Sequence, residues 1–514
     1  MSTTRLILLT TTVIAAAVME LIDISIVNVA LSQMGGNLGA TLEDTAWVIT
    51  SYAIANVIVI PLTGFLAAWL GRRTYFIGSI ALFTLASLLC GLSTNIWVLV
   101  AFRFLQGIGG GALISTSQVI VFESFPVNKR SVASAIFGIG VFTGPTIGPT
   151  LGGYILDITS WHWIFLVNVP IGVAVLIGSL LLVKEPAQRQ VVKSIDYVGL
   201  LLLVVGVGSL QILLERGQEE DWFQTAYISY LTATTVVAIV GFIWWELRVS
   251  QPIVNLRVLR SPTLAVASVL TFVTGVGLFT SVYLTPVFAQ RLLGFPTLAS
   301  GLLLLPGALL AIVALILTAR LLQTGVPTQL IIAFGFIIFI VFSWQMGHLS
   351  PNAGKGDFYG PLIFRGVGLA LLTVPLTALA LSGLSPAEVP QGAAFNNMMR
   401  QLGGSFGIAG TNTYLANRIA QHRTDLVTQL TDNDPETITW LTTASHRLVG
   451  QGATELGAIQ QSYRLLDQTV TRQATVDSYL DAYLAIGLVF ALAMPLILLV
   501  VRAAKPVTVS LSDH

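Results

Sequence analysis

The chain has 514 residues, of which 54% are apolar and only 10% are charged, with a formal net charge of +1. Soluble proteins contain about 25% charged residues, so this composition excludes a soluble enzyme and indicates a polytopic all-α membrane protein. The near-zero net charge gives no indication of nucleic-acid binding, and the single Cys90 excludes an internal disulfide.

Hydrophobic runs separated by short polar breaks predict fourteen membrane-spanning helices, the first of them a retained span rather than a signal peptide. Because fourteen is even, both termini lie on one side. Basic residues such as Arg72, Arg73, Lys129 and Arg130 gather in the connections on that side and place both termini in the cytoplasm. The predicted spans cover residues 6–32, 46–69, 75–93, 96–120, 132–156, 164–183, 197–214, 225–245, 263–289, 298–320, 328–347, 359–382, 391–416 and 479–501.

The first predicted span contains two acids, Glu20 and Asp23, three residues apart and therefore on one face of the helix. A carboxylate near the bilayer centre costs roughly 2.5–3.5 kcal/mol on insertion scales, so the two acids need a reason to be there. One interpretation is a purely structural pair that a basic partner neutralises. The other is a protonation site on a transport path.

Arg103 in the fourth span is the natural partner for these acids. Counted at 1.5 Å per residue from the outer ends of their spans, Asp23 and Arg103 both lie roughly 12–14 Å below the outer surface. The arginine would favour an ionised Asp23, whereas Glu20 lies about one turn deeper, beside a like charge, and should take up a proton more readily. We therefore assign Asp23, Glu20 and Arg103 to proton coupling.

The fifth span is rich in glycine and proline. Gly144, Gly148 and Gly152 recur every four residues and predict a stripe on which another helix can approach closely. Pro145 and Pro149 follow the same period and remove backbone donors, so we expect this helix to bend.

Other polar residues inside predicted spans are candidates for contact with a transported molecule, although interhelical hydrogen bonding is the alternative for each of them. Arg400 stands apart, because a charge about ten residues into a span needs a partner or water. The side chains that we assign to substrate binding are Glu20, Asn28, Asn56, Gln106, Tyr283, Asn396, Asn397 and Arg400.

A weak repeat divides the chain. The pair Phe102-Arg103 followed by glycines in the fourth span returns as Phe364-Arg365 followed by glycines in the twelfth. Two halves of six spans separated by an inserted pair would produce this pattern. The predicted domains are an N-terminal six-helix bundle at 1–190, an inserted two-helix hairpin at 191–260 and a C-terminal six-helix bundle at 261–514.

One connection is long, the predicted periplasmic loop 417–477. Leu456, Ile459, Tyr463, Leu466 and Val470 step by three and four within it and predict an amphipathic helix, and a second helix is possible over 436–449. These helices either pack on the membrane domain or form a docking surface for another protein.

Chemistry-bearing motifs of other classes are not found in the sequence. The chain has no phosphate-binding G-x-x-x-x-G-K-[ST] motif, no histidine–cysteine cluster for a metal and no evident nucleophile–base pair. We therefore expect no enzyme activity, no metal and no cofactor, with an ion gradient as the energy source. A membrane-embedded enzyme and a non-transporting scaffold are the alternatives, and the buried acids argue against the scaffold.

Four motifs resemble those of the fourteen-span drug:proton antiporters of the major facilitator superfamily. They are the first-span run LIDISIVNVAL at 21–31, Arg103 with Gln106-Gly107, the glycine–proline repeat at 144–153, and WHWIFLVNVPIG at 161–172. The resemblance covers nearly the whole chain. Two features depart from the family pattern: Ala68 and Trp69 stand where an acid and commonly an arginine are found, and Glu20 is outside the first-span signature.

This resemblance implies two helical bundles around a central cavity, alternating access, and proton-driven export of amphipathic drugs, with protons as the coupling ion. It also implies a periplasmic membrane-fusion adaptor and an outer-membrane channel as partners. The alternative is a dedicated exporter of one metabolite, fatty acid or siderophore. Residues that the resemblance assigns to conformational change are Gly64, Gly71, Arg72, Arg73, Gly144, Pro145, Gly148, Pro149 and Gly152.

Overall fold

The computed structural model describes residues 3–126, 129–185, 195–382, 384–385, 388–430 and 434–499. Within these ranges the chain forms helices joined by short connections, without a strand. The predicted all-helical class is confirmed. The predicted domain limit at 190 and 191 lies outside the described residues, so that boundary stays a prediction.

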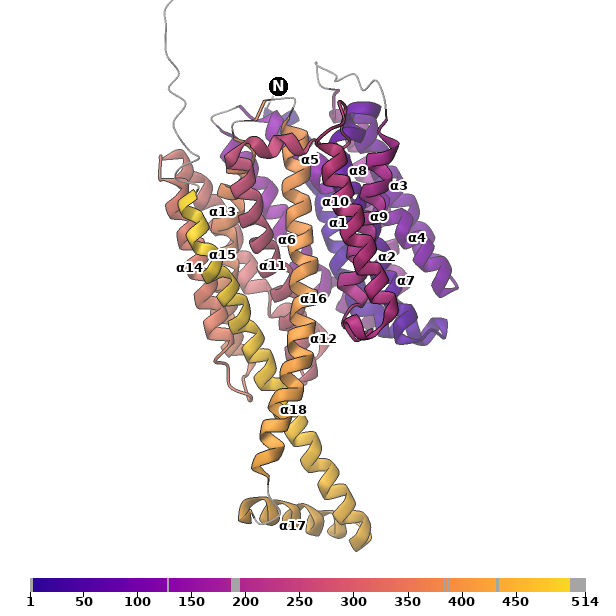
Figure 1. Ribbon diagram of the computed structural model, residues 1–514, viewed down its shortest axis with the longest axis vertical. Coiled ribbons are helices and arrows are strands. Elements are labelled where there is room, and N and C mark those ends of the chain that lie inside the picture. The colour runs from indigo at the N-terminus through magenta and orange to yellow at the C-terminus, as the bar shows by residue number, and fades with distance from the viewer. Residues whose placement is uncertain are drawn as a thin grey trace, which may run out of the picture.

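The first half of the chain forms eight helices that contact one another closely (Figure 1). The predicted fourth span is divided into α4 and α5 at Gly111, and the predicted sixth span into α7 and α8. The helices are α1 (Thr3–Leu38), α2 (Leu42–Leu70), α3 (Arg72–Gly91), α4 (Ile96–Gly110), α5 (Leu113–Ser124), α6 (Arg130–Ile158), α7 (His162–Leu166) and α8 (Asn168–Leu182).

A two-helix hairpin follows, made of α9 (Tyr197–Arg216) and α10 (Ala226–Glu246), with the 3-10 turn η2 (Trp222–Gln224) near its tip. Leu203 and Val207 of α9 share an apolar cluster with Val57 and Ile58 of α2. At the tip, Trp222 Nε1 donates a hydrogen bond to Thr413 Oγ1 in the second half of the chain, at 3.0 Å. The hairpin therefore contacts both halves.

The second half has its own core, in which Phe339, Phe342, Tyr483 and Phe490 are fully buried. The short turns η3 (Leu256–Arg260) and η4 (Met494–Leu496) flank its helices. These are α11 (Pro262–Arg291), α12 (Thr297–Leu302), α13 (Leu305–Gln323), α14 (Thr328–Met346), α15 (Lys355–Leu381), α16 (Val389–Gln429), α17 (Pro435–Gly450) and α18 (Glu455–Ala493).

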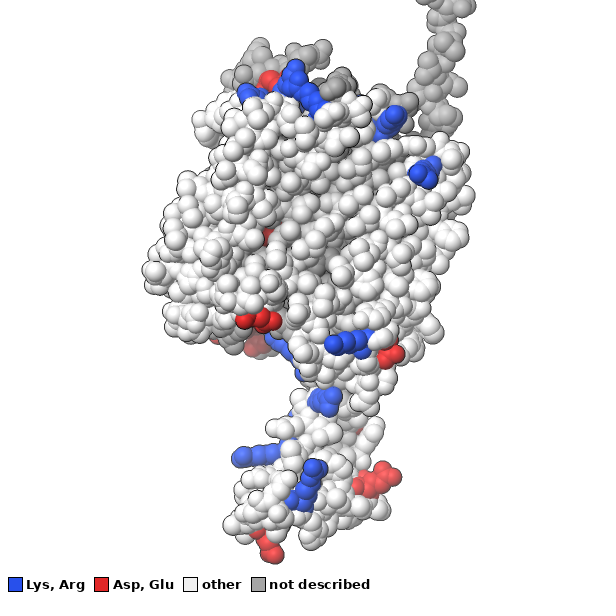
Figure 2. Space-filling view, turned by 180° about the vertical axis from the view of Figure 1, so that it is seen from behind, with Lys and Arg blue, Asp and Glu red and all other residues white. Residues whose placement is uncertain are grey.

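Thirteen helices in the described residues are long and apolar enough to cross a membrane. Figure 2 shows the charged side chains near the two ends of the molecule and on the projection below it, with a nearly uncharged band between them. The predicted span 391–416 belongs to α16, which is not among the thirteen but lies against α11 and α2. The count of fourteen therefore stays a prediction.

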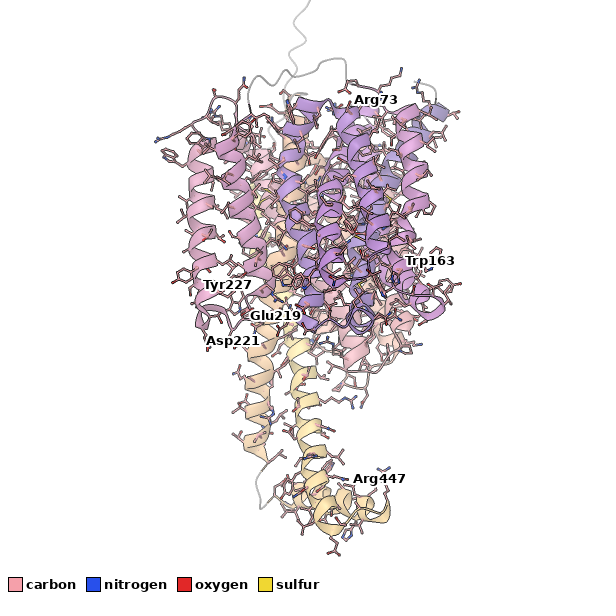
Figure 3. All side chains as sticks on the ribbon, turned by 90° about the vertical axis from the view of Figure 1, so that its right-hand side faces the viewer. Arg73, Trp163, Glu219, Asp221, Tyr227 and Arg447 are labelled. Atoms are coloured by element: carbon pink, nitrogen blue, oxygen red, sulfur yellow. The ribbon has the colours of Figure 1, made fainter. Side chains whose placement is uncertain are left out.

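The long connection is helical rather than a loop. Helix α16 continues for 41 residues and α18 for 39, and both leave the bundle to carry α17 at the tip of a projection (Figures 1 and 3). Arg418 pairs with Asp481, and Arg423 with Asp467, so ion pairs join α16 and α18 along it. Both predicted amphipathic helices in this region are confirmed, as α17 and the beginning of α18.

Candidate functional site

Asp23 of α1 and Arg103 of α4 form an ion pair in the interior of the first half. Arg103 Nη1 donates to Asp23 Oδ2 at 2.6 Å, and the side chains are 1% and 0% exposed for Arg103 and Asp23 respectively. The predicted pairing of these two residues is confirmed. The arginine compensates the charge of a carboxylate that burial would otherwise penalise heavily.

Amide side chains complete the hydrogen bonding of this pair. Gln106 Nε2 and Asn168 Nδ2 each donate to Asp23 Oδ1 at 2.9 Å, and Gln106 Oε1 accepts from Arg103 Nη1 at 2.7 Å. Gln106 follows Arg103 by three residues and so lies on the same face of α4. Asn168, the first residue of α8, completes the group. The four side chains form one polar network that holds the Asp23 carboxylate in place.

The Arg103 guanidinium is also held by its surroundings. Its Nε donates to the Val48 carbonyl at 3.1 Å, and its Cζ lies 4.2 Å from the centre of the Tyr52 ring and 5.6 Å from that of Phe165. Aromatic faces attract a cation at such distances, most strongly where water is excluded. The arginine is therefore immobilised on several sides.

Glu20 has a different environment. Asn56 Nδ2 donates to its Oε1 at 2.8 Å, and the backbone N–H of Ile114 donates to its Oε2 at 3.1 Å. Ile114 is the second residue of α5, where a helix leaves its first N–H groups without an intrahelical acceptor. The Glu20 carboxylate therefore caps α5, at the end of the helix where negative charge is stabilised.

The break between α4 and α5 creates this arrangement. The glycines at the break lie against α2 so closely that a Cβ on Gly110 would be 2.3 Å from Tyr52 Oη, and one on Gly111 would be 2.7 Å from the Asn56 carbonyl oxygen. Only glycine permits this approach. The glycine run therefore brings the start of α5 and the Asn56 side chain to Glu20.

A small cavity lies between the two halves. Leu21, the residue after Glu20, belongs to the lining, and so does Ile114, whose backbone N–H donates to Glu20. Arg400 lines the cavity from the opposite half. Arg400 is the charged side chain of this lining, and no acid pairs with it among the described residues. The lining consists of Leu21, Ile60, Ile114, Val141, Pro145, Leu278, Phe279, Asn397, Arg400 and Gln401.

The residues assigned to substrate binding are divided among several environments. Asn397 and Arg400 line the cavity, whereas Asn56 and Gln106 bind the acids of α1. Asn28 is exposed, and Tyr283 and the buried Asn396 are not in the lining. Contact of any of these residues with a transported molecule stays a prediction.

The glycine stripe of α6 contacts the helix that carries the acids. A Cβ on Gly144 would be 2.4 Å from Leu21 Cβ, one on Gly148 would be 1.9 Å from Ser25 Oγ, and one on Gly152 would be 2.9 Å from Ile26 Cγ1. The predicted close helix contact is confirmed. Pro145 and Pro149 lie inside α6, and a bend at them stays a prediction.

The connection between α2 and α3 lies at the opposite end of the molecule from Glu219 and Asp221 of the hairpin tip, as the position of Arg73 in Figure 3 shows. Gly71 has φ +89°, a backbone conformation that favours glycine. The backbone N–H groups of Arg72 and Arg73 donate to Glu185, and the Arg72 side chain pairs with Glu123. Glu185 and Glu123 therefore supply the acidic partners at this connection, where position 68 is an alanine.

Many long apolar helices, a buried ion pair and a cavity between two halves are typical of membrane transporters of small molecules. The chain belongs to the Major Facilitator Superfamily, whose family pattern matches residues 13–408. It is a transporter and not an enzyme.

Among curated relatives, the multidrug export protein EmrB of Escherichia coli K12 is 35% identical over 475 residues, 92% of this chain and 91% of that protein. The fatty acid resistance protein FarB of Neisseria gonorrhoeae is 34% identical over 495 residues, 96% of this chain and 94% of that protein. The chain is thus a multidrug transporter of the EmrB type.

Among solved structures, the human organic anion transporter MFSD10 (TETRAN) matches with a TM-score of 0.59 at 12% identity, over 96% of this chain and 99% of that one. At this identity the likeness shows the fold alone.

Proposed function

We propose that this protein exports amphipathic molecules across the bacterial inner membrane by alternating access, driven by protons that enter through Glu20. The observation that carries the proposal is the placement of Glu20. Its carboxylate is fully buried, accepts two hydrogen bonds and has no basic partner among the described residues. Its sequence neighbour Leu21 and its hydrogen-bond donor Ile114 both line the cavity.

The two acids have different tasks in this proposal. Asp23 keeps its charge because Arg103, Gln106 and Asn168 all donate to it. Glu20 binds a proton when the site is open to the acidic side. A protonated Glu20 is a weaker acceptor for the Ile114 N–H, so protonation loosens the start of α5 and with it one wall of the cavity.

The test is transport in proteoliposomes with an imposed pH gradient, over a panel of cationic, neutral and acidic amphipathic compounds. We expect uptake into inside-out vesicles that stops when the gradient is dissipated, and substrate-driven proton release by the purified protein. Transport that responds to a sodium gradient and not to pH would contradict proton coupling.

Arg400 favours a second candidate, a dedicated exporter of acidic amphipaths such as a fatty acid. A guanidinium in a largely apolar cavity attracts a carboxylate strongly, because little water screens the pair. Arg400→Gln should reduce export of acidic compounds about tenfold or more and leave that of neutral compounds nearly unchanged. Arg423→Gln, on the same helix but in the projection, is the matched control. Equal loss for acidic and neutral compounds would contradict a charge-selecting role.

The projection formed by α16, α17 and α18 is proposed to bind an EmrA-like periplasmic membrane-fusion adaptor that continues into an outer-membrane channel. Leu456, Ile459 and Tyr463 of the predicted apolar stripe are 75%, 50% and 55% exposed, whereas Val470 is buried, so the part of this face farther from the bundle is not used for packing. Apolar side chains grouped on an exposed helix face are typical of protein-binding surfaces.

Shortening the 417–477 segment tests this part. We expect transport in vesicles to be retained and drug resistance in cells to be lost. Loss of both activities would mean that the projection is needed for folding.

A further inference from the structure

Arg365 of α15 is buried deep in the second half, with 3% of its surface exposed. Arg365 Nη1 donates to Ser281 Oγ at 3.4 Å, which is long for a hydrogen bond. Arg365 Nε has no hydrogen-bond partner among the described residues. A guanidinium offers five N–H donors. Most of this hydrogen-bonding capacity is therefore unused by the protein.

The surroundings of Arg365 contain hydroxyl groups but no carboxylate. Ser281 and Thr285 lie one helical turn apart on α11, and the Tyr483 hydroxyl of α18 is 3.0 Å from Thr285 Oγ1. All three side chains are fully buried. Among the residues that the structure describes, no acid forms an ion pair with Arg365. The positive charge is thus surrounded by neutral groups.

The sequence repeat allows the partner of Arg365 to be compared with the partner of Arg103 in the first half. Arg103 on α4 faces Asp23 on α1, the first helix of its half, and Arg365 on α15 faces Ser281 on α11, the first helix of the other half. The serine therefore occupies the place of the acid. The hydroxyl of Ser281 donates to the Leu278 carbonyl and that of Thr285 to the Ser281 carbonyl, so the donors left for an anion are those of the guanidinium. An uncompensated buried charge is strongly destabilising.

We propose that the unused N–H groups of Arg365, beside Ser281, Thr285 and Tyr483, bind a small monovalent anion of the size of chloride. None of the four side chains lines the cavity between the halves. The site is therefore separate from Arg400, and the anion serves as a counter-ion that stabilises the second half. This proposal is independent of which molecules are exported.

The experiment compares the melting temperature of the purified full-length protein in chloride, nitrate and gluconate at matched ionic strength, with binding of radioactive chloride measured in parallel. We expect chloride to raise Tm by about 5 °C over gluconate in a saturable way, because a ligand that binds only the folded state stabilises it. Nitrate should act similarly. Gluconate, a much larger anion, is the reference.

Two variants make the result specific. Ser281→Asp supplies the missing carboxylate, so it should abolish chloride binding and the Tm response while raising Tm in gluconate. Arg365→Gln should abolish binding as well, and Arg400→Gln, which changes an arginine in the cavity, should retain it. Because Ser281→Asp and Arg365→Gln alter the site in opposite ways, a folding defect in one leaves the other as the test.

An unchanged wild-type Tm in all three anions, with no bound chloride, would overturn the proposal. So would a chloride response that persists in both Ser281→Asp and Arg365→Gln, since it would come from elsewhere in the protein. A rise in Tm that an acidic amphipath causes through Arg365, and that chloride does not cause, would also overturn the proposal. It would mean that the site binds the substrate and not a small anion.

Discussion

Each half of the protein holds one arginine deep among its helices, but the two arginines face different partners. Arg103 donates to the carboxylate of Asp23 and to an amide, whereas Arg365 contacts the hydroxyl of Ser281. One difference lies on the first helix of each half, which supplies an acid in the first half and a serine in the second. It teaches that a repeated architecture can keep its cation while only one half keeps an acid that pairs with it.

The largest effect should come from removing the acid of the first half. Asp23→Asn leaves Arg103 buried without its counter-ion, which should lower the free energy of unfolding by about 3–5 kcal/mol and abolish substrate-driven proton release in proteoliposomes. Ser281→Asn, the corresponding change in the second half, is the control and should leave proton release intact. Unaltered proton release in Asp23→Asn would remove Asp23 from the coupling machinery.

Glu20→Gln should have the next largest effect. The glutamine places an N–H₂ group against either the Asn56 amide or the Ile114 N–H, so the unfolding free energy should fall by roughly 1–3 kcal/mol. Export should lose its dependence on the pH gradient, and cationic substrates should be affected more than neutral ones. Transport assays at several imposed gradients check both points. An equal loss for cationic and neutral substrates would contradict a charge-selecting role for Glu20.

A direct comparison of the two arginines comes third. Arg103→Gln leaves Asp23 unpaired and should be strongly destabilising, but Arg365→Gln removes a charge that has no acid partner. In chloride-free buffer we expect its cost to be less than about 1 kcal/mol, because an uncompensated buried charge is lost. Denaturation of both variants in gluconate measures the contrast. Equal losses of stability would show that Arg365 has an internal counter-ion after all.

The smallest effect should come from the connection between α2 and α3. Arg72→Gln breaks the ion pair with Glu123, whose side chains are 14% and 34% exposed. Partly exposed pairs contribute about 0.2–1 kcal/mol, so stability should change little. If Arg72 controls the movement of the halves, the export rate will fall while stability is retained. An unchanged rate would remove this residue from the conformational motif.

The pairing of Asp23 with Arg103 could be predicted from the sequence, because two residues at the same depth of neighbouring spans need each other in an apolar medium. The cap that Glu20 forms on α5 could not. It depends on a break in the fourth span at Gly111, and hydrophobic periodicity continues through that break without interruption. The hydrogen bond from Asn168 to Asp23 was not predicted for a similar reason, since it depends on where α8 begins.

The helical class and the amphipathic segments at α17 and α18 were also predictable, since they rest on composition and local period. The shape of the projection was not. Residues 417–477 are polar enough to indicate a loop, yet helix α16 continues through their first part, and ion pairs such as Arg418 with Asp481 hold α18 beside it. Pairings of this kind between distant segments leave no periodic signal in a single sequence.

The continuity of α16 has a mechanical consequence. One continuous helix carries Arg400 at the cavity and Gln429 near the tip, and the 29 residue steps from one to the other span roughly 43 Å at 1.5 Å per residue. A tilt of about 5° at the cavity would therefore displace the far end by roughly 4 Å, provided that the rod stays straight. If the projection binds the proposed adaptor, this one helix connects the cavity directly to the adaptor contact.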